Sequence, residues 1–320
     1  MVIICIIIIT FVFFLIVALI IYTRIVRRKN AQIKAADQAR MDFFARMSHD
    51  MRTPMNGIIG MIDLSQDSDD IDEIKSNIEK AKSASSYMLS LINDTLDLQK
   101  IENGKLCLEY QVVNCKKFID NLISMVSSSA KAKNIQLEFE NENVNLDVYI
   151  KVDTVRVKQI FMNLLSNAIK FTPDGGIIKI VIECLDRNDL FSHIKVMISD
   201  TGIGMSKEYI EKSLFKAYSQ EHNEMTAKYA GSGLGLAITK NLVDLMNGKI
   251  SVESQILEGT TFIIELDIEI VEDKKVIDEI NNTNEKANIV KSELVGKRIL
   301  MCEDHPLNAE ITRKILRKAG

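Results

Sequence analysis

Two patterns of apolar residues divide the chain into a helical part and a compact α+β part. Between residues 33 and 64, apolar residues recur at steps of three and four, which predicts one face of a helix: Phe44, Met47, Met51, Met55, Ile58 and Ile62. After an acidic turn at residues 66–70 the pattern continues at Ile71, Ile74, Ile78, Ala81, Met88, Leu91, Thr95, Leu98 and Ile101. Two amphipathic helices joined by a short turn predict an antiparallel hairpin. Two such hairpins in a dimeric four-helix bundle would bury both apolar stripes.

Beyond Gly104 the pattern of apolar and polar residues predicts alternating helices and strands. We expect a helix over residues 116–131, strands over 136–139 and 176–183, and a strand with period-two alternation over 194–199. These elements predict an α+β domain that ends near Ile270, followed by a polar linker over 271–296. Residues 297–304 then predict a buried strand and the residues after them a helix. We interpret 297–320 as the beginning of a further, incomplete domain.

The start of the chain is strongly apolar, because Thr10 is the only polar residue between positions 2 and 21. At about 1.5 Å per residue such a run spans roughly 30 Å, which predicts a transmembrane helix over residues 2–22. A signal peptide is the alternative, but no basic segment precedes the run. Arg24, Arg27, Arg28 and Lys29 follow it. They predict a single-pass protein of the cell inner or plasma membrane whose catalytic domains are cytoplasmic and whose sensor segment lies upstream.

The overall charge argues against nucleic acid as a partner. The formal net charge is −4, and the 26% of charged residues form no sustained basic segment. Five scattered cysteines without a CxxC pair favour reduced thiols over a metal site.

One histidine stands out by its neighbours. His49 lies on the face of its predicted helix opposite the methionine stripe, so we expect it to face solvent. Asp50 can polarise the imidazole N–H, Thr53 follows one turn later, and Pro54 should bend the helix just after the histidine. An ordinary surface histidine is the commoner explanation for a lone histidine.

A second group of polar residues shares one face of a helix over residues 159–170. Gln159, Asn163, Asn167 and Lys170 are separated by steps of four, four and three. Asparagine oxygens can bind Mg²⁺ without adding negative charge beside a triphosphate, and a lysine supplies a positive charge for phosphate. A solvated helix face is the alternative.

Two glycine-rich segments follow. Asp200, Gly202 and Gly204 come where a strand ends, which places a carboxylate to accept a hydrogen bond from an amine. The second segment, Gly231-Ser-Gly233-Leu-Gly235, lets the backbone approach phosphates and opens a helix whose N-terminus favours anions. It is not a P-loop, because no Gly-Lys-Ser/Thr follows.

Taken in order, these four segments resemble the H, N, G1 and G2 boxes of sensor histidine kinases. The ATP-binding domain of this family is similar to that of gyrase and mismatch-repair ATPases, and the resemblance covers roughly residues 35–270. Leu214-Phe215 resembles the F box of the family, and residues 258–262 resemble the turn before its last strand. Residues 299–308 look like the first strand of a receiver domain, which would make the protein a hybrid kinase.

The resemblance implies a role for each matching residue. His49 would be the phosphoacceptor, and so a phosphohistidine, with Asp50 the assisting acid and Thr53 the residue linked to phosphatase chemistry. Asn167 would bind Mg²⁺, Asn163 and Lys170 would lie on the phosphate side, and Asp200 would anchor adenine. The remaining implied ATP contacts are Gly202, Gly204, Phe215, Lys228, Gly231, Gly233, Leu234, Gly235 and Thr260. Glu303 and Asp304 would be the acidic pair of an incomplete receiver magnesium site.

The sequence departs from the family pattern in three places. Asp50 stands where glutamate is commoner, and Tyr218 replaces a phenylalanine. In the lid before the second glycine segment, Ala227 stands where an arginine is usual and Ala230 where glycine is frequent. Lys228 could substitute for the arginine in stabilising charge on the transferred phosphate.

The fold we expect is a helical hairpin that forms a dimeric four-helix bundle, then an α+β sandwich of the gyrase and histidine-kinase type, after an N-terminal transmembrane helix. The predicted domains are a transmembrane helix over 2–22, a juxtamembrane helix over 23–36, a dimerisation and phosphotransfer domain over 37–104, an ATP-binding domain over 110–270, a linker over 271–296 and the start of a receiver over 297–320.

The predicted activity is ATP- and Mg²⁺-dependent phosphorylation of His49, followed by transfer to a receiver aspartate. The predicted partners are a second copy of the chain, a receiver domain or response regulator, and the membrane. A degenerate ATP-binding scaffold or phosphatase is one alternative, and a gyrase-like ATPase without histidine chemistry is another.

Overall fold

The computed structural model describes residues 2–188, 190–221, 232–272, 300–304 and 306–318. In the first helix it leaves out the side chains of a number of positions, His49 among them. The chain divides into two compact units, Met1–Gln99 and Lys100–Gly320.

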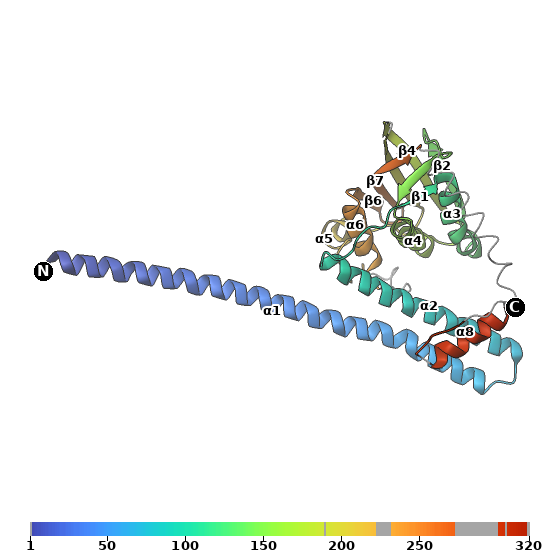
Figure 1. The fold of residues 1–320 in the computed structure, drawn as a ribbon, viewed down its shortest axis with the longest axis horizontal. Coiled ribbons are helices and arrows are strands. Elements are labelled where there is room, and N and C mark those ends of the chain that lie inside the picture. The colour runs from blue at the N-terminus through green and yellow to red at the C-terminus, as the bar shows by residue number, and fades with distance from the viewer. Residues whose placement is uncertain (1, 189, 222–231, 273–299, 305, 319–320) are drawn as a thin grey trace. The chain divides into compact units, whose positions relative to one another are not determined.

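The first unit consists of two long helices, α1 (Val2–Gln66) and α2 (Ile71–Glu102) (Figure 1). The end of α2, from Lys100 to Glu102, belongs to the second unit. Residues 67–70 separate the two helices, and their polar side chains cap α2. The Asp70 carboxylate accepts the Asp72 N–H at 2.9 Å, and Ser68 Oγ donates to Glu73 at 2.6 Å. The acidic residues in the first turn of α2 also suit the positive end of the helix dipole. The predicted pair of helices joined by a short turn is therefore confirmed.

The prediction of a membrane span at the start of the chain requires correction. None of the helices in the described part of the chain is long and apolar enough to cross a bilayer. The apolar residues at the start do not form a separate element, because α1 runs on for 65 residues through Arg24, Arg27 and Lys29. The predicted transmembrane helix over residues 2–22, and with it the predicted membrane location, is wrong.

The hairpin buries part of its apolar surface and exposes the rest. Pro54 lies inside α1 and is buried, and Leu91, Thr95 and Leu98 are buried on α2. Other apolar residues of both helices are more than two fifths exposed: Met55, Ile59, Ile62, Leu64, Ile71, Ile78, Leu89 and Leu96. The hairpin taken alone thus leaves part of the apolar surface of each helix uncovered.

The second unit is built on a seven-stranded mixed sheet. The strands are β1 (Gln111–Asn114), β2 (Gln136–Glu142), β3 (Tyr149–Val152), β4 (Ile177–Arg187), β5 (Phe191–Asp200), β6 (Lys249–Gln255) and β7 (Gly259–Val271). Their order is β1-β3-β7-β5-β4-β2, and β6 also pairs with β7. Only the β2–β4 pair is parallel. β7 is the organising strand, because β3, β5 and β6 all pair with it.

Helices α3 (Cys115–Ala132), α4 (Thr154–Phe171) and α6 (Gly235–Leu245) pack on one face of this sheet. A short helix, α5 (Lys207–Lys212), contacts β6. Alternate strand residues point toward the helices and are buried, as Val196 and Ile198 are on β5. The largest fully buried side chains of this core include Ile160, Leu164, Leu165, Ile178, Ile198, Ile238, Leu242 and Ile264. The predicted two-layer α+β domain is confirmed.

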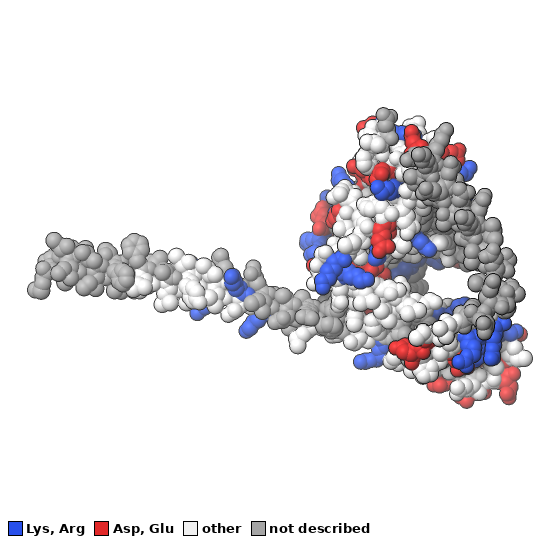
Figure 2. Space-filling model, viewed as in Figure 1, with Lys and Arg blue, Asp and Glu red and all other residues white. Residues whose placement is uncertain are grey.

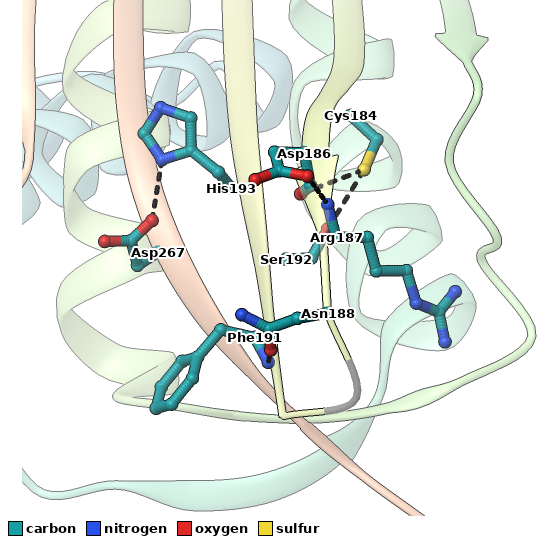
Figure 3. Close-up of polar contacts among 8 residues, drawn as sticks. All are labelled: Cys184, Asp186, Arg187, Asn188, Phe191, Ser192, His193 and Asp267. Carbon is teal, nitrogen blue, oxygen red and sulfur yellow. Dashed lines mark hydrogen bonds and ion pairs between the residues drawn. The ribbon is translucent and has the colours of Figure 1, made fainter.

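The other face of the sheet is charged and paired. Lys179 lies 2.8 Å from Glu140, Lys151 lies 2.9 Å from Glu269, and His193 Nδ1 lies 2.6 Å from an Asp267 carboxylate oxygen (Figure 3). In the view of Figure 2, basic and acidic side chains are interspersed over this unit.

The end of the chain departs from the predicted strand. Residues 300–304 form no strand, and Leu300 is 97% exposed. A helix does follow, α8 (Pro306–Lys318), with Ile311 and Ile315 exposed. An isolated strand has no neighbour to satisfy its backbone hydrogen bonds, so the segment cannot form a sheet by itself.

Asp153 makes two backbone contacts that start the α4 helix. Its carboxylate accepts the Arg156 N–H at 3.0 Å as the N-cap and the Glu109 N–H at 2.8 Å, and its side chain is buried. We expect Asp153→Ala to lower the free energy of unfolding by about 1–3 kcal/mol, because it leaves two backbone donors without their acceptor. Urea unfolding followed by circular dichroism measures this change.

The matched control is Asn114→Ala at the N-cap of α3, where the exposed side chain accepts only the Lys117 N–H in the described contacts. This substitution should lower the free energy of unfolding by about 1 kcal/mol or less. Equal losses in the two variants would contradict the assignment of the larger role to Asp153.

Candidate functional site

Asp200, at the end of β5, is the centre of a cluster of polar backbone groups. Its Oδ1 accepts the Gly202 N–H at 2.8 Å, and the Thr260 N–H also donates to its carboxylate. Burial raises the pKa of Asp200 to about 6, against the lowering effect of these two hydrogen bonds. A carboxylate kept partly out of water in this way is prepared to accept a hydrogen bond from a ligand donor.

The loop after Asp200 is pressed between two other backbone segments. Gly204 has a φ of 65°, and a Cβ on it would collide with the Gln255 carbonyl oxygen. A Cβ on Gly202 would lie 2.8 Å from the Phe171 carbonyl oxygen. Ile203 forms backbone hydrogen bonds to both neighbouring segments. Its N–H donates to the Phe171 carbonyl oxygen at 3.3 Å, and its carbonyl oxygen accepts the Leu257 N–H at 2.8 Å. Both glycines of the predicted motif are therefore sterically required.

Ser254, which the sequence analysis did not identify, connects this loop to the turn between β6 and β7. Its Oγ accepts the Met205 N–H at 2.9 Å, donates to Gly259 O at 2.8 Å and lies 2.9 Å from Thr260 Oγ1. The predicted site residue Thr260 is buried. A serine in a strand carries no recognisable signal, so its role depends on contacts that only the fold reveals.

The predicted polar face of α4 lies beside the same loop. Asn163, Asn167 and Lys170 on this face each have a different environment. Asn163 Nδ2 donates to Gly235 O at 3.1 Å and contacts Thr239 Oγ1 at 3.4 Å, so this amide positions the start of α6. Asn167 is half-buried one turn further along. Burial lowers the pKa of Lys170, whose Nζ lies 4.8 Å from the centre of the Phe171 ring.

A lysine from α3's C-terminal cap holds the end of α4. Lys133 Nζ donates to three carbonyl oxygens, those of Ile169 at 2.9 Å, Lys170 at 3.1 Å and Thr172 at 3.1 Å. These are the acceptors that a helix C-terminus leaves unpaired. The partners lie 36 to 39 residues apart in the chain, so no local pattern predicts them.

The second glycine segment forms the approach to α6. Gly233 has a φ of 68°, and its carbonyl accepts the Tyr218 N–H at 2.9 Å. Leu234 is buried and serves as the N-cap residue, so the helix begins at Gly235 and leaves its first N–H groups without partners inside the helix. Phe215 is half-buried in the preceding turn. The predicted contacts Lys228 and Gly231, like Ala227, lie outside the described residues.

His49 is part of α1, and the direction of its side chain lies outside what the structure describes. Its neighbour Asp50 is half-buried and Thr53 is exposed. The pKa of Tyr87 on α2 is raised by burial and, more weakly, by the charges of Asp50 and Asp94. Asp50 therefore lies close enough to Tyr87 of α2 for its charge to act on the phenol.

The described residues present few clustered donors for a metal ion. Among the described residues, no group of three or more histidine, cysteine or acidic side chains gathers in one place. Glu303 and Asp304 are exposed, and Asn308 Nδ2 donates to Glu303 at 3.2 Å. Mg²⁺ often needs only one or two protein oxygens when a substrate supplies phosphates, so the amide of Asn167 is compatible with that role.

Two family models match the chain, in an order that agrees with the two units. The model for the His Kinase A (phospho-acceptor) domain matches residues 39–104. The model for the histidine kinase-, DNA gyrase B-, and HSP90-like ATPase matches residues 152–270. Together the two matches take up more than half of the chain.

Several sensor kinases are similar to this chain over most of its length. The autoinducer 2 sensor kinase/phosphatase LuxQ of Vibrio vulnificus is 34% identical over 296 residues, which are 91% of this chain and 34% of that protein. The sensor histidine kinase GacS of Pseudomonas protegens is 32% identical over 286 residues, 89% of this chain and 30% of that protein. The hybrid signal transduction histidine kinase L of Dictyostelium discoideum is 40% identical over 72% of this chain and 13% of that protein. The chain thus spans about a third or less of these relatives.

Solved structures agree with this assignment. Full-length ShkA in complex with AMPPNP is 25% identical, with a TM-score of 0.53 over 71% of this chain and 46% of that chain. The Acinetobacter baumannii histidine kinase AdeS, at 23% identity and a TM-score of 0.50 over 68% of this chain and 96% of that chain, supports the fold alone. With a phospho-acceptor domain followed by an ATPase domain, the chain belongs to the sensor histidine kinases of two-component systems.

Proposed function

We propose that this chain is a protein-histidine kinase that uses ATP to phosphorylate His49 and then passes the phosphoryl group to an aspartate of a receiver domain. The observation that carries this proposal is the half-buried Asp200 carboxylate, held beside two sterically required glycines and next to the polar face of α4. This arrangement suits the recognition of a purine amine at one end and phosphates at the other.

Each part of the site has a role in nucleotide binding under this proposal. Asp200 accepts a hydrogen bond from the adenine amino group, and Gly202 and Gly204 let the backbone approach the base. Lys170 and the start of α6, at Gly235, attract the phosphates. Asn167 supplies an amide oxygen to Mg²⁺, which when bound neutralises phosphate charge. Asn163 contributes indirectly, because its amide holds Gly235 in place.

The chemical step takes place at His49. A neutral imidazole nitrogen attacks the γ-phosphorus, a nitrogen–phosphorus bond forms, and the bond to the β,γ-bridging oxygen breaks with its electron pair leaving on ADP. Asp50 can accept a hydrogen bond from the other ring nitrogen, which favours the tautomer whose lone pair attacks. A match of the phospho-acceptor model over residues 39–104 supports the choice of His49.

The exposed apolar residues of the hairpin support a dimer. On α1, Met55, Ile59 and Ile62 follow at steps of four and three, which is the spacing of a helical seam. On α2, Ile71 and Ile78 are one heptad apart, as are Leu89 and Leu96. A second hairpin would cover both stripes in a four-helix bundle.

A receiver domain is the proposed phosphate acceptor. We assign residues 297–320 to the start of such a domain, because the exposed acidic pair Glu303 and Asp304 is followed directly by the amphipathic helix α8. The name of the relative in Dictyostelium discoideum, a hybrid kinase, agrees with this assignment.

The first test uses γ-labelled ATP and two variants. We expect acid-labile, base-stable label on the wild-type chain and none on His49→Gln, which should still bind nucleotide because the substitution leaves the ATPase domain unchanged. Asn167→Ala should lose both label and Mg²⁺-dependent binding, because it removes the metal's amide oxygen. Nucleotide titration alongside the labelling measures both properties.

The outcomes separate the proposal from its alternatives. Binding without label in the wild-type chain would indicate a scaffold, and ATP hydrolysis with no labelled protein would indicate a gyrase-like ATPase. Label that persists in His49→Gln would place the phosphoacceptor elsewhere.

A second prediction concerns the raised pKa of Asp200. The folded-state pKa of about 6 lies above the unfolded value near 4, so the ionised carboxylate destabilises the folded state above pH 6, and this effect is relieved as the pH falls toward 4. We expect Asp200→Asn to raise the free energy of unfolding at pH 8 by about 1–3 kcal/mol and by less at pH 4. The same variant should lose nucleotide binding, because the amide presents a donor where adenine needs an acceptor.

Urea unfolding at several pH values and nucleotide titration measure these effects. Asp174→Asn, in the exposed turn after α4, is the control and should change neither property. Reduced stability of Asp200→Asn at pH 8 would show that burial of the charge is not the dominant effect.

A third prediction concerns the dimer. Ile78→Lys should weaken self-association at least tenfold, because a charge replaces an exposed apolar residue within the α2 stripe. Sedimentation velocity measures the change. Val155→Lys, at an exposed apolar residue on α4, should leave the association unaltered. Equal weakening by both substitutions would argue against a hairpin interface.

A further inference from the structure

The ATPase domain contains an apolar cavity at the end of the sheet opposite to Asp200. It has a volume of about 90 Å³ and lies between α3, the first turns of α4 and the half of β5 that precedes Val196. Phe118 and Leu122 of α3, Phe161 of α4 and Leu266 of β7 are among the residues that line it. None of the predicted nucleotide-site residues lines this cavity.

The cavity exists because short side chains occupy positions that face it. Cys115, Val152, Val157 and Val196 all line it, and all four are buried in the core. A longer residue at any of these positions would extend into the space. Protein cores are normally packed without voids of this size, so the space is a specific feature of this core.

Water has few partners inside the cavity. Burial raises the pKa of the Cys115 thiol to about 11, so the thiol is un-ionised at neutral pH. Cys184 Sγ already contacts Ser192 Oγ at 3.2 Å and the Asp186 carbonyl oxygen at 3.5 Å (Figure 3). A buried water needs two to four polar partners, and apolar cavities of about 150 Å³ stay dry and accept benzene.

The polar side chains at the edge of the cavity are exposed and directed to other contacts. Asn145 Oδ1 accepts the Asp147 N–H at 3.0 Å, and Arg187 lies 3.6 Å from Glu272. Asn143 and Asn145 belong to the β2–β3 loop, which is exposed, so the cavity reaches the surface at this edge. A ligand could therefore enter without opening the sheet.

We propose that this cavity is a binding site for a small apolar molecule of about the size of a single aromatic ring. The lining favours a ligand without charge and without strong hydrogen-bonding groups, because most of it is apolar. Its polar side chains Cys184, Ser192 and Arg187 already have partners, and the Cys115 thiol is un-ionised. The proposal is independent of the proposed kinase activity, since it concerns only the core of the ATPase domain.

Fluorobenzene is a suitable probe, because its fluorine signal reports binding directly. With the full chain, we expect saturable binding in ¹⁹F NMR and a rise in the thermal midpoint that grows with the concentration of the probe. Val157→Phe adds a ring inside the cavity and should weaken binding at least tenfold. Val155→Phe places the same ring on the exposed side of the same helix and should bind as the wild type does.

A second variant keeps the test decisive if Val157→Phe does not fold. Phe161→Leu removes part of the wall and enlarges the cavity, so it should bind fluorobenzene at least as tightly as the wild type. Absence of saturable binding by the wild-type chain would overturn the proposal. Binding that Val157→Phe leaves unchanged, or that Val155→Phe weakens equally, would place the probe elsewhere and would also overturn it.

Discussion

The backbone after β5 and the turn between β6 and β7 lie so close together that neither has room for a side chain at the points of contact. A Cβ on Gly204 would collide with the Gln255 carbonyl oxygen, and one on Gly259 would collide with the carbonyl oxygen of Asp200. Both residues also have positive φ values. Glycine is therefore needed at both positions for conformational and for steric reasons. The remaining geometry of the site depends on these two close backbone contacts, because they bring the Thr260 N–H to the Asp200 carboxylate.

The site is consequently a compromise between stability and function. A carboxyl group surrounded by sheet and loop would be more stable when protonated, but two backbone N–H groups hold it as an acceptor near neutral pH. The same pattern recurs on α4, where burial disfavours the charge of Lys170 while Lys133 fixes the helix end that carries it. Burial strengthens the electrostatic interactions that the charged groups of the site can make with a ligand. It also raises the free energy required to keep these groups charged in the folded protein.

Features of the fold that depend on contacts between residues close in sequence were predictable, and features that depend on contacts between distant residues were not. The helices over 116–131 and 159–170 and the strands over 136–139 and 194–199 were predictable, because apolar periodicity is a local property. Asp200, Gly202 and Gly204 were found because a carboxylate and two glycines directly follow a strand. The strands β1 and β3 have four residues each, too few for a periodic signal. Lys133 and Ser254 have ordinary local sequences and act through partners that only the fold brings near.

Two expectations were wrong for a related reason. The segment over 297–304 has the composition of a buried strand, but its described residues, 300–304, form no strand and Leu300 remains exposed. A strand forms only where a neighbouring strand accepts its hydrogen bonds. The run over 2–22 has the composition of a membrane span, whereas the described part of the chain contains no helix that qualifies as one. In both cases the composition of a segment alone did not determine its structure, because the structure also depends on the residues around the segment.

The pairing of β7 has a consequence for the synthesis of the protein. β7 is the last strand of the sheet, and β3, β5 and β6 all pair with it, β3 across more than a hundred residues of chain. During translation the earlier strands leave the ribosome without the neighbour that joins them, and residue synthesis proceeds at about 5–20 residues per second. The ATPase domain can therefore complete its sheet only after residue 271 has left the exit tunnel. Until then the edges of β3, β5 and β6 that β7 will cover are open to other chains, so this interval is the stage of synthesis at which a chaperone would protect the domain most.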